Sequence, residues 1–382
     1  MKVLRNILNK KKSTLLGVGP MSVNCVHATV EIANENNIPL MMIASRRQVD
    51  CLDLGGGYVN NWSTEDYSSY VKKIDIKSNI ILSRDHGGPY QNNLEIDNNL
   101  SLKDAMESAK KSFEIDIAND FKIIHIDPSI DPSGNLETDE ILARLKELYI
   151  FCIETASRHN KEIIIEIGTE EQSGGTNTIE ELEYSLNVIT QFCKKNNIQN
   201  PFFVVVQTGT KVMETKNIGI FKEISENYEQ SHIPNLIKLC DKYGVYIKQH
   251  NTDYLDDDFL CKHPSFGIHA ANVAPEYGVV ETKKLLEILE QNNLKQLKDQ
   301  FIELCVKSNK WAKWVIDKNK LDDYQKTIIS GHYSFSTPKF IEIKKKIANE
   351  INTDILKLDL ILKDAVKKSI LRYVKDFNLA QL

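Results

Sequence analysis

Ile80-Ile81-Leu82-Ser83-Arg84-Asp85-His86-Gly87-Gly88-Pro89 is an apolar run that ends in an acid, an imidazole and two glycines. A run rich in β-branched residues that leads into polar residues and glycines is typical of a strand that meets a loop. The same arrangement recurs along the chain, and its repetition determines the predicted fold class.

Seven other short apolar runs resemble this one. They span 14–18, 40–44, 122–126, 163–167, 202–206, 245–248 and 266–269. Their nearly continuous hydrophobicity is typical of strands that are covered on both faces. The spacing leaves room for a crossover helix between consecutive runs, and apolar residues recur at helical spacing in 102–113, 138–159 and 178–197.

Eight strand–helix units within about 290 residues predict an α/β protein with a (β/α)₈ (TIM) barrel. A doubly wound open sheet is the competing arrangement. It usually has a Gly-rich fingerprint after its first strand, and Gly17-Val18-Gly19-Pro20 does not supply one. We expect the barrel to occupy residues 1–285 and a helical extension, rich in Glu, Lys and Leu, to pack on it over residues 286–382.

Composition excludes several classes of protein. The 382 residues carry a formal net charge of −5, so no overall basic field favours nucleic acid. The longest apolar runs are strand-sized, which argues against a membrane protein, and the charged N-terminus lacks the apolar core of a signal peptide. Seven scattered cysteines without a C-x-x-C pair predict reduced thiols and a cytoplasmic location.

Polar side chains follow most of the predicted strands. In a (β/α)₈ barrel the carboxyl ends of the strands and their loops build the active site. Two imidazoles and a carboxylate, His86, Glu166 and His250, form a set that suits Zn²⁺ or a similar divalent ion with open positions for substrate. Alternation along the strand leaves open whether Glu166 faces the outer helices instead, in which case Glu170 or Glu171 would take its place.

Other polar residues near the strand ends are candidates for contact with substrate. They are Arg46, Gln48, His125, Asp127, Gln207, Asn251, Asp253, Asn272 and His332. For His125 an ordinary hydrogen-bonding role is favoured over substrate contact. Gln207 offers either a weak amide ligand or a hydrogen bond to substrate. His332, in the extension, either folds back over the site or caps a helix, and the sequence slightly favours the cap.

Several short motifs occur in a characteristic order. They are Asp85-His86-x-Gly-Pro, 122–127, Ile167-Gly168-Thr169-Glu170, Val205-Val206-Gln207-x-Gly209 and His250-x-Thr252-Asp253-Tyr254. Gln48-Val49 with Gly56-Gly57-Tyr58, and the late segment 331–336, extend the pattern. Together these motifs resemble the non-catalytic (Z) subunit family of class II D-tagatose-bisphosphate aldolases, GatZ/KbaZ-like. That family is related to the class II ketose-bisphosphate aldolases, which are metal-dependent (β/α)₈ barrels.

The resemblance implies a role for each matching residue. His86 and His250 would be metal ligands, Glu166 would match the Glu beside the metal, and Asp85 would be the acid/base at the carbon–carbon bond. Gln207 stands where the aldolases have another His. Gly174-Gly175 is followed by Thr176-Asn177 where the aldolases carry an acid, so Glu170 or Glu171 would exchange the proton α to the carbonyl.

These residues predict a metal-dependent class II aldolase that acts on a phosphorylated ketose, with dihydroxyacetone phosphate as one fragment. We expect the phosphate to rest on loop N–H groups near residues 251–253 and Asn272, aided by Arg46. A non-catalytic subunit that stabilises a partner aldolase is one alternative, and a sugar-phosphate epimerase that uses retro-aldol chemistry is another. Self-association into a homo-oligomer is left open.

Overall fold

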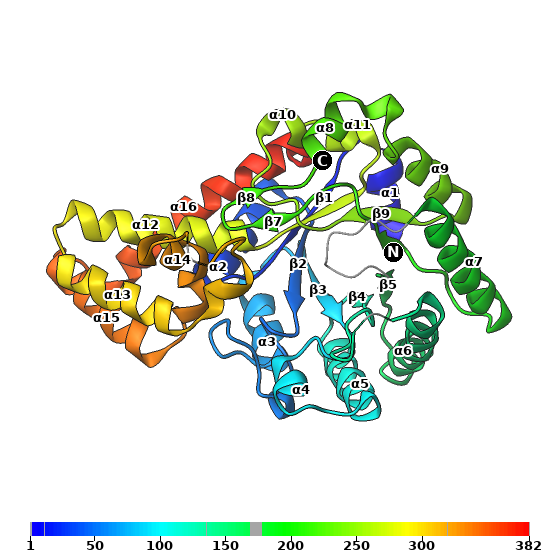
Figure 1. Ribbon diagram of the computed structural model, residues 1–382, viewed down its shortest axis with the longest axis horizontal. Helices are drawn as coiled ribbons and strands as arrows, with labels where there is room; N and C mark the ends of the chain where they lie inside the picture. Colours follow the sequence, from blue (N-terminus) through cyan, green and yellow to red (C-terminus); the bar gives the residue numbers. More distant parts are fainter. Residues whose placement is uncertain (1, 11, 135, 169–177, 319, 382) are drawn as a thin grey trace.

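Parallel strands close into a barrel in the computed structural model, which describes residues 2–10, 12–134, 136–168, 178–318 and 320–381 (Figure 1). The order around the barrel is β1-β10-β9-β6-β5-β4-β3-β2, and every neighbouring pair is parallel. The strands are β1 (Leu15–Val18), β2 (Leu40–Ser45), β3 (Ile80–Gly87), β4 (Ile123–Ile126), β5 (Ile164–Ile167), β6 (Phe203–Val205), β9 (Tyr246–Gln249) and β10 (Ala270–Val273). Seven of these strands lie within or overlap a predicted run; the eighth, β10, begins one residue after the predicted run 266–269, whose first residue ends helix α11 (His263–Phe266). The predicted (β/α)₈ barrel is confirmed.

Helices connect the strands and cover the outside of the barrel. They are α2 (Val23–Asn36), α3 (Thr64–Ile74), α4 (Asn93–Asp97), α5 (Leu102–Ala118), α6 (Thr138–Arg158), α7 (Ile179–Lys195), α8 (Phe221–Glu226), α9 (Ile233–Tyr243), α10 (Asp257–Leu260) and α11 (His263–Phe266). Capping residues set several of their starts. At α7 the Thr178 side chain accepts from the Glu181 backbone N–H, and Glu181 accepts from the backbone of Thr178. This capping box satisfies two N–H groups that the helix itself leaves unpaired.

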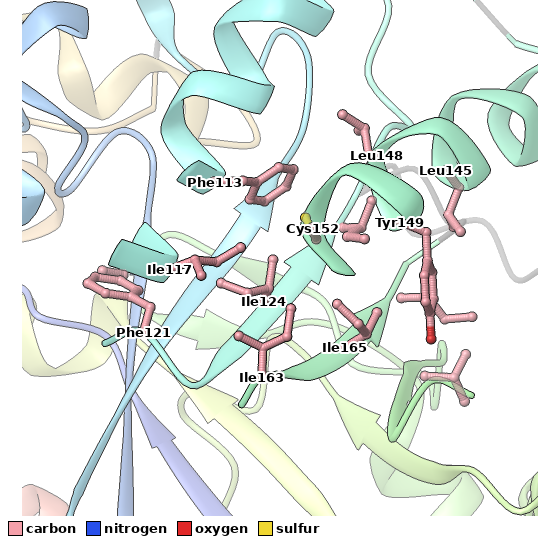
Figure 2. Packing of buried hydrophobic residues seen from close by; sticks show 14 of the residues in the cluster. Phe113, Ile117, Phe121, Ile124, Leu145, Leu148, Tyr149, Cys152, Ile163 and Ile165 are labelled. Atoms are coloured by element: carbon pink, nitrogen blue, oxygen red, sulfur yellow. The ribbon is translucent and has the colours of Figure 1, made fainter. Parts of the chain in front are cut away.

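The main core lies between the strands and the helix layer. Figure 2 shows Phe113 and Ile117 of α5 beside Ile124 of β4, and Cys152 of α6 close to Ile165 of β5. These side chains have no exposed surface. Full burial of one such apolar side chain contributes about 1.5–3 kcal/mol. At the end of the barrel where the strands start, helix α1 (Lys2–Lys10) lies against them, and the Arg5 guanidinium stands 5.1 Å from the Phe202 ring centroid.

Helices after β10 form a lobe beside the barrel (Figure 1). They are α12 (Pro275–Gln291), α13 (Lys295–Lys307), α14 (Asp323–Ser330) and α15 (Pro338–Glu350), with the short turns η3 (Lys310–Lys313) and η4 (Gly331–Ser334). The lobe has its own apolar cluster, which includes Leu285, Phe301 and Ile343. The last helix, α16 (Ile355–Asp376), packs against α2 and α12 and returns the chain to the barrel.

The expected division at 285/286 falls inside α12. Tyr277, near the start of this helix, packs in the barrel cluster, whereas Leu285 and Leu289 pack in the lobe. Helix α12 is therefore the element that joins the two parts. Among the described residues, no helix combines the length and the apolar character that crossing a membrane requires.

Candidate active site at the carboxyl ends of the strands

Strand alternation places the predicted polar residues inside the barrel. Ile124, Ile126, Ile165 and Ile167 pack in the cluster beneath the outer helices. Successive side chains on a strand point to opposite faces, so the residues between them face inward. His125 and Glu166 are register partners on β4 and β5, and both are buried. The question that the sequence left open for Glu166 is thereby answered, because its side chain faces the barrel axis.

Four side chains meet near the carboxyl end of the barrel. Ligand atoms of Asp85, His125, Glu166 and His250 all lie within 4.8 Å of one another. His250 Nε2 is 3.3 Å from Glu166 Oε1 and 3.8 Å from Asp85 Oδ1, and His125 Nδ1 is 3.7 Å from Glu166 Oε1. Ligands about 2.1 Å from a tetrahedral Zn²⁺ lie about 3.4 Å from each other. The spacing of this donor set therefore suits a divalent ion.

Asn272, on β10, orients two members of this set. Its Nδ2 lies 3.1 Å from Asp85 Oδ1 and 3.1 Å from His250 Nε2. A carboxylate only accepts, so the atom that faces Asp85 is the amide N–H₂ group. His250 Nε2 lies within hydrogen-bonding distance of both Asn272 Nδ2 and Glu166 Oε1, and the tautomer of its ring sets which of them it accepts from or donates to. With Nε2 unprotonated, His250 joins the carboxylates of Asp85 and Glu166 as a set of atoms that fits a divalent ion.

His86 lies next to this donor set and is held by Asp127. Its Nδ1 donates to Asp127 Oδ2 over 2.7 Å, and Gln91 Nε2 donates to the same oxygen over 2.9 Å. The ring centroid of His86 is 4.9 Å from that of His250 and 5.2 Å from that of His125. The predicted trio of His86, Glu166 and His250 is thus only partly matched, because the four-residue set contains Asp85 and His125 but not His86.

His125 has the hydrogen-bonding role that the sequence favoured, and it also belongs to the donor set. The backbone N–H of His86, which adopts a positive φ of 45°, donates to His125 Nδ1 over 3.1 Å. Nε2 of His125 is buried near Gly168, and a Cβ added at Gly168 would stand 2.5 Å from it. This nitrogen has no hydrogen-bond partner among the described residues.

Lys248 is a buried member of the site that sequence reasoning missed. Its Nζ lies 2.7 Å from Glu166 Oε2, and both side chains are at most 1% exposed. Burial raises the pKa of Glu166, but Lys248 and the nearby histidines more than offset this effect and hold the pKa at about 2. Burial likewise raises the pKa of Asp85, yet His86 and His250 bring it well below its usual range. Both carboxylates are therefore ionised.

The site opens into a cavity of about 880 Å³. Asp85, His86, His250, Asn251 and Asn272 line it on the barrel side. On the other side it is lined by residues of the extension, among them Lys310, Lys313, Trp314 and Tyr333. The cavity is large enough for a sugar phosphate, and its two walls come from distant parts of the sequence.

Several predicted substrate contacts have other partners in the structure. Arg46 is fully buried, and its guanidinium pairs with Asp50 over 2.9 Å and with Glu95 over 2.7 Å. Arg46 also lines the cavity, but two carboxylates neutralise its charge, and its role in phosphate binding stays a prediction. Asp127 holds His86, as described above. Gln48 Oε1 accepts from the backbone N–H of Ser45 over 2.8 Å, although the residue also lines the cavity.

Three more residues predicted to contact substrate make contacts within the protein: Gln207, Asp253 and His332. Gln207 Oε1 accepts from the backbone N–H groups of Gly209 and Thr210, so it stabilises its own turn. Asp253 Oδ1 accepts from the N–H groups of Ala274 and Glu276 at the start of α12. His332 is buried against Tyr333, with ring centroids 4.1 Å apart, and is not among the residues that line the cavity. Glu170 and Glu171 lie outside the described residues.

Fold and site together define a (β/α)₈-barrel protein whose acidic and imidazole groups meet at the carboxyl ends of the strands. The chain belongs to the GatZ/KbaZ-like family. The sequence model described as "D-tagatose-1,6-bisphosphate aldolase subunit GatZ/KbaZ-like" matches residues 4–336. No curated protein matches the chain in sequence.

Solved structures share the fold at low sequence identity. A probable tagatose 6-phosphate kinase from Sinorhizobium meliloti 1021 has a TM-score of 0.76 at 17% identity, with 96% of this chain and 100% of that chain covered. Fructose-bisphosphate aldolase from Campylobacter jejuni has a TM-score of 0.55 at 12% identity, covering 99% and 93%. Fructuronate-tagaturonate epimerase from Cohnella laeviribosi has a TM-score of 0.57 at 9% identity, covering 96% and 81%.

Proposed function

We propose that the protein is a metal-dependent class II aldolase that cleaves or forms a carbon–carbon bond in a phosphorylated ketose, with dihydroxyacetone phosphate as one fragment. One observation carries the proposal. His250 Nε2 lies 3.3 Å from Glu166 Oε1 and 3.8 Å from Asp85 Oδ1, and this cluster of atoms that can ligate a divalent ion lies beside a cavity of sugar-phosphate size. Membership of a family described as an aldolase subunit supports the same chemistry.

Glu166 and His250 are the proposed metal ligands within the donor set, and His86 is the proposed third. Nδ1 of His86 donates to Asp127, so Nε2 is the basic nitrogen of the ring. His125 is less suited, because its Nδ1 already accepts from the His86 backbone. A divalent ion such as Zn²⁺, when bound here, would polarise the ketose carbonyl and stabilise the enediolate as a Lewis acid.

Asp85 is the proposed acid/base. Its carboxylate is ionised, lines the cavity and is held in position by Asn272. In the cleavage direction Asp85 takes the proton from the hydroxyl one carbon beyond the breaking bond. That carbon becomes an aldehyde, the carbon–carbon bond breaks, and its electron pair passes to the ketose fragment as an enediolate. Proton return to the enediolate carbon is the proposed task of Glu170 or Glu171.

The test combines metal content with turnover. We expect the purified protein to bind a divalent metal, and His250→Ala and Glu166→Gln to lose it. His159→Ala, at a partly exposed histidine on the C-terminal side of α6, is the matched control and should keep it. Cleavage of tagatose 1,6-bisphosphate and of fructose 1,6-bisphosphate is measured, with and without chelator, by the amount of dihydroxyacetone phosphate released. Absence of both metal and turnover would sink the proposal, and NMR of the products would distinguish cleavage from epimerisation.

A second function is favoured by the ion pair between Lys248 and Glu166. The ammonium group neutralises the carboxylate that would hold the metal, over 2.7 Å. A barrel that carries its own internal cation does not need a metal for the stability of the site. This feature suits a non-catalytic subunit that stabilises a partner class II aldolase. Activity of a partner aldolase, measured with and without equimolar amounts of this protein, separates this role from independent turnover.

A further inference from the structure

The cavity beside the candidate active site has a basic wall that the site chemistry does not use. Arg47 follows β2, and Lys310 and Lys313 lie on η3 of the extension, some 260 residues later in the sequence. All three line the same cavity as Asp85 and His250. The barrel and the lobe thus bring cationic side chains together at a place where a small molecule would touch both walls.

Arg47 differs sharply from its neighbour Arg46. Two carboxylates neutralise Arg46, whereas Arg47 forms no ion pair with any described residue. Arg47 Nε is buried and has no hydrogen-bond partner in the described part of the chain. Burial lowers the pKa of the Arg47 guanidinium. Burying a cation without a partner is costly, so this side chain is suited to a ligand that supplies the negative charge.

Lys313 stands at the same wall without a carboxylate partner among the described residues. Its Nζ lies 4.8 Å from the ring centroid of Trp314 and 5.4 Å from that of Tyr333. The Lys313 side chain is exposed to the cavity, and the protein around it, with the charges of Arg47 and Lys310, lowers the pKa of Lys313 to about 7. An anion between Arg47 and Lys313 would relieve the repulsion between them.

Tyr333 adds a neutral donor to this wall. Its hydroxyl oxygen accepts from the Trp314 indole N–H over 3.0 Å, so its own proton is available to a ligand. The backbone N–H of Glu214, in the turn between the antiparallel strands β7 (Val212–Met213) and β8 (Lys216–Asn217), donates to the Trp314 carbonyl oxygen over 2.6 Å. On the other side, the backbone N–H of Asn60 donates to Ser336 Oγ over 2.6 Å. The basic wall is therefore anchored to the barrel at two points.

We propose that Arg47 and Lys313, with the Tyr333 hydroxyl, bind a phosphate group of the sugar substrate, so that the extension determines specificity for phosphorylated sugars. A planar guanidinium suits two phosphate oxygens at once, and an ammonium adds a compact second charge. The site rests on the proposed function for its substrate class. Its binding test needs no turnover, however, so a failure of the aldolase reaction and a failure of this site give different results.

The experiment measures binding of inorganic phosphate and of glycerol 3-phosphate to the full-length protein by calorimetry, with chelator present to remove any metal-bound phosphate. We expect Arg47→Gln and Lys313→Met each to weaken binding of both by about tenfold or more, since a charge-assisted hydrogen bond is lost. Arg47→Lys should recover part of the affinity. Lys320→Met, at a side chain that is 80% exposed and absent from the cavity wall, should bind as the wild type does.

Other results would overturn the proposal. Equal affinity in the wild type, Arg47→Gln and Lys313→Met would place the phosphate elsewhere. Tighter binding of a uronate than of glycerol 3-phosphate would assign the wall to carboxylates instead. Thermal denaturation of each variant identifies any loss of phosphate binding that comes from unfolding. If the wild type cleaves sugar bisphosphates while both variants keep its KM, the aldolase function stands and this phosphate site does not.

Discussion

Lys248 Nζ lies 2.7 Å from Glu166 Oε2 across the inside of the barrel, and neither side chain reaches solvent. The ion pair joins β9 to β5, two strands that are separated by β6. The attraction between the two charges must offset the desolvation of both, so removing either partner alone is strongly destabilising. It is also the electrostatic partner of the carboxylate proposed to hold a metal.

Lys248→Met should leave Glu166 as an unpaired buried charge in the metal-free protein. We expect the free energy of unfolding to fall by about 3–5 kcal/mol. Divalent metal should recover part of that loss, because the ion would then provide the positive charge. Urea denaturation with chelator and with Zn²⁺ measures both effects. Lys242→Met removes an exposed pair with Glu183 and should leave the stability nearly unchanged in either condition. A metal-free Lys248→Met protein as stable as the wild type would contradict the expectation.

Gly17→Ala should disturb the site through Asn272. A Cβ at Gly17 would stand 2.3 Å from Asn272 Oδ1, so the amide would have to move away from Asp85 and His250. We expect weaker metal binding and lower turnover. Gly267→Ala is the control: its strained φ of +75° and a 3.3 Å contact with Ile237 should reduce stability without affecting metal binding. Metal titration and thermal denaturation of both variants, measured together, separate loss of site geometry from loss of stability.

Seven of the barrel strands were predictable because each contains a short, nearly continuous apolar run, and a strand buried on both faces leaves that signal in the sequence. The predicted run 266–269 ends just before β10, whose Ala-Ala-Asn-Val sequence carries a weaker apolar signal. Because the predicted runs are almost continuously apolar, the sequence does not show which way Glu166 points. Every residue of 163–167 except Glu166 is Ile, so the run has no polar face from which the alternation of its side chains could be read. The structure supplies the missing information through the packing of Ile165 and Ile167 beneath the helices.

Residues of the site that were missed come from contacts distant in sequence. A lone Lys248 in a strand looks like a solvent-facing residue until Glu166 is known to lie opposite it. Lys313 belongs to a short turn of the extension and carries no local pattern. Arg46 and Arg47 are adjacent and chemically identical, so only the positions of Asp50 and Glu95 show which of them is neutralised.

Glu281 should make stability depend on pH. It is 2% exposed, accepts hydrogen bonds from Ser22 and Asn24, and has its pKa raised to about 7 by burial. Between an unfolded pKa of about 4.3 and the folded value, the folded protein keeps a proton that the unfolded chain has lost. The free energy of unfolding therefore falls as pH rises through this interval and levels off above it.

Glu281→Gln has no proton to lose, so this contribution to the pH dependence should disappear. We expect the variant to gain about 2–3 kcal/mol relative to the wild type between pH 5 and pH 8. Urea denaturation at both pH values gives the difference. Glu342→Gln, at an exposed residue of α15 that pairs loosely with Lys339, should follow the wild-type curve. A Glu281→Gln protein that follows the wild-type curve would mean that burial of this carboxyl does not shift its ionisation.

Asp127→Asn tests whether His86 is a metal ligand. The carboxylate accepts from His86 Nδ1 over 2.7 Å and so makes Nε2 the basic nitrogen. An asparagine can keep the contact with Ser129 through its oxygen and turn its N–H₂ group toward His86, which would favour the other tautomer, with the proton on Nε2. We expect metal affinity to fall by about 10–100-fold, the usual effect of losing a partner that orients a ligand.

Asp131→Asn makes the same change four residues further on, where the carboxylate pairs with Arg144 away from the cavity lining. It should leave metal affinity unchanged. Competition with a chromophoric chelator measures both variants on one scale. If Asp127→Asn binds metal as tightly as the wild type and His125→Ala does not, His125 rather than His86 completes the ligand set with Glu166 and His250. The distances of 3.7 Å and 3.3 Å from Glu166 Oε1 to the two imidazoles would then describe the metal site itself.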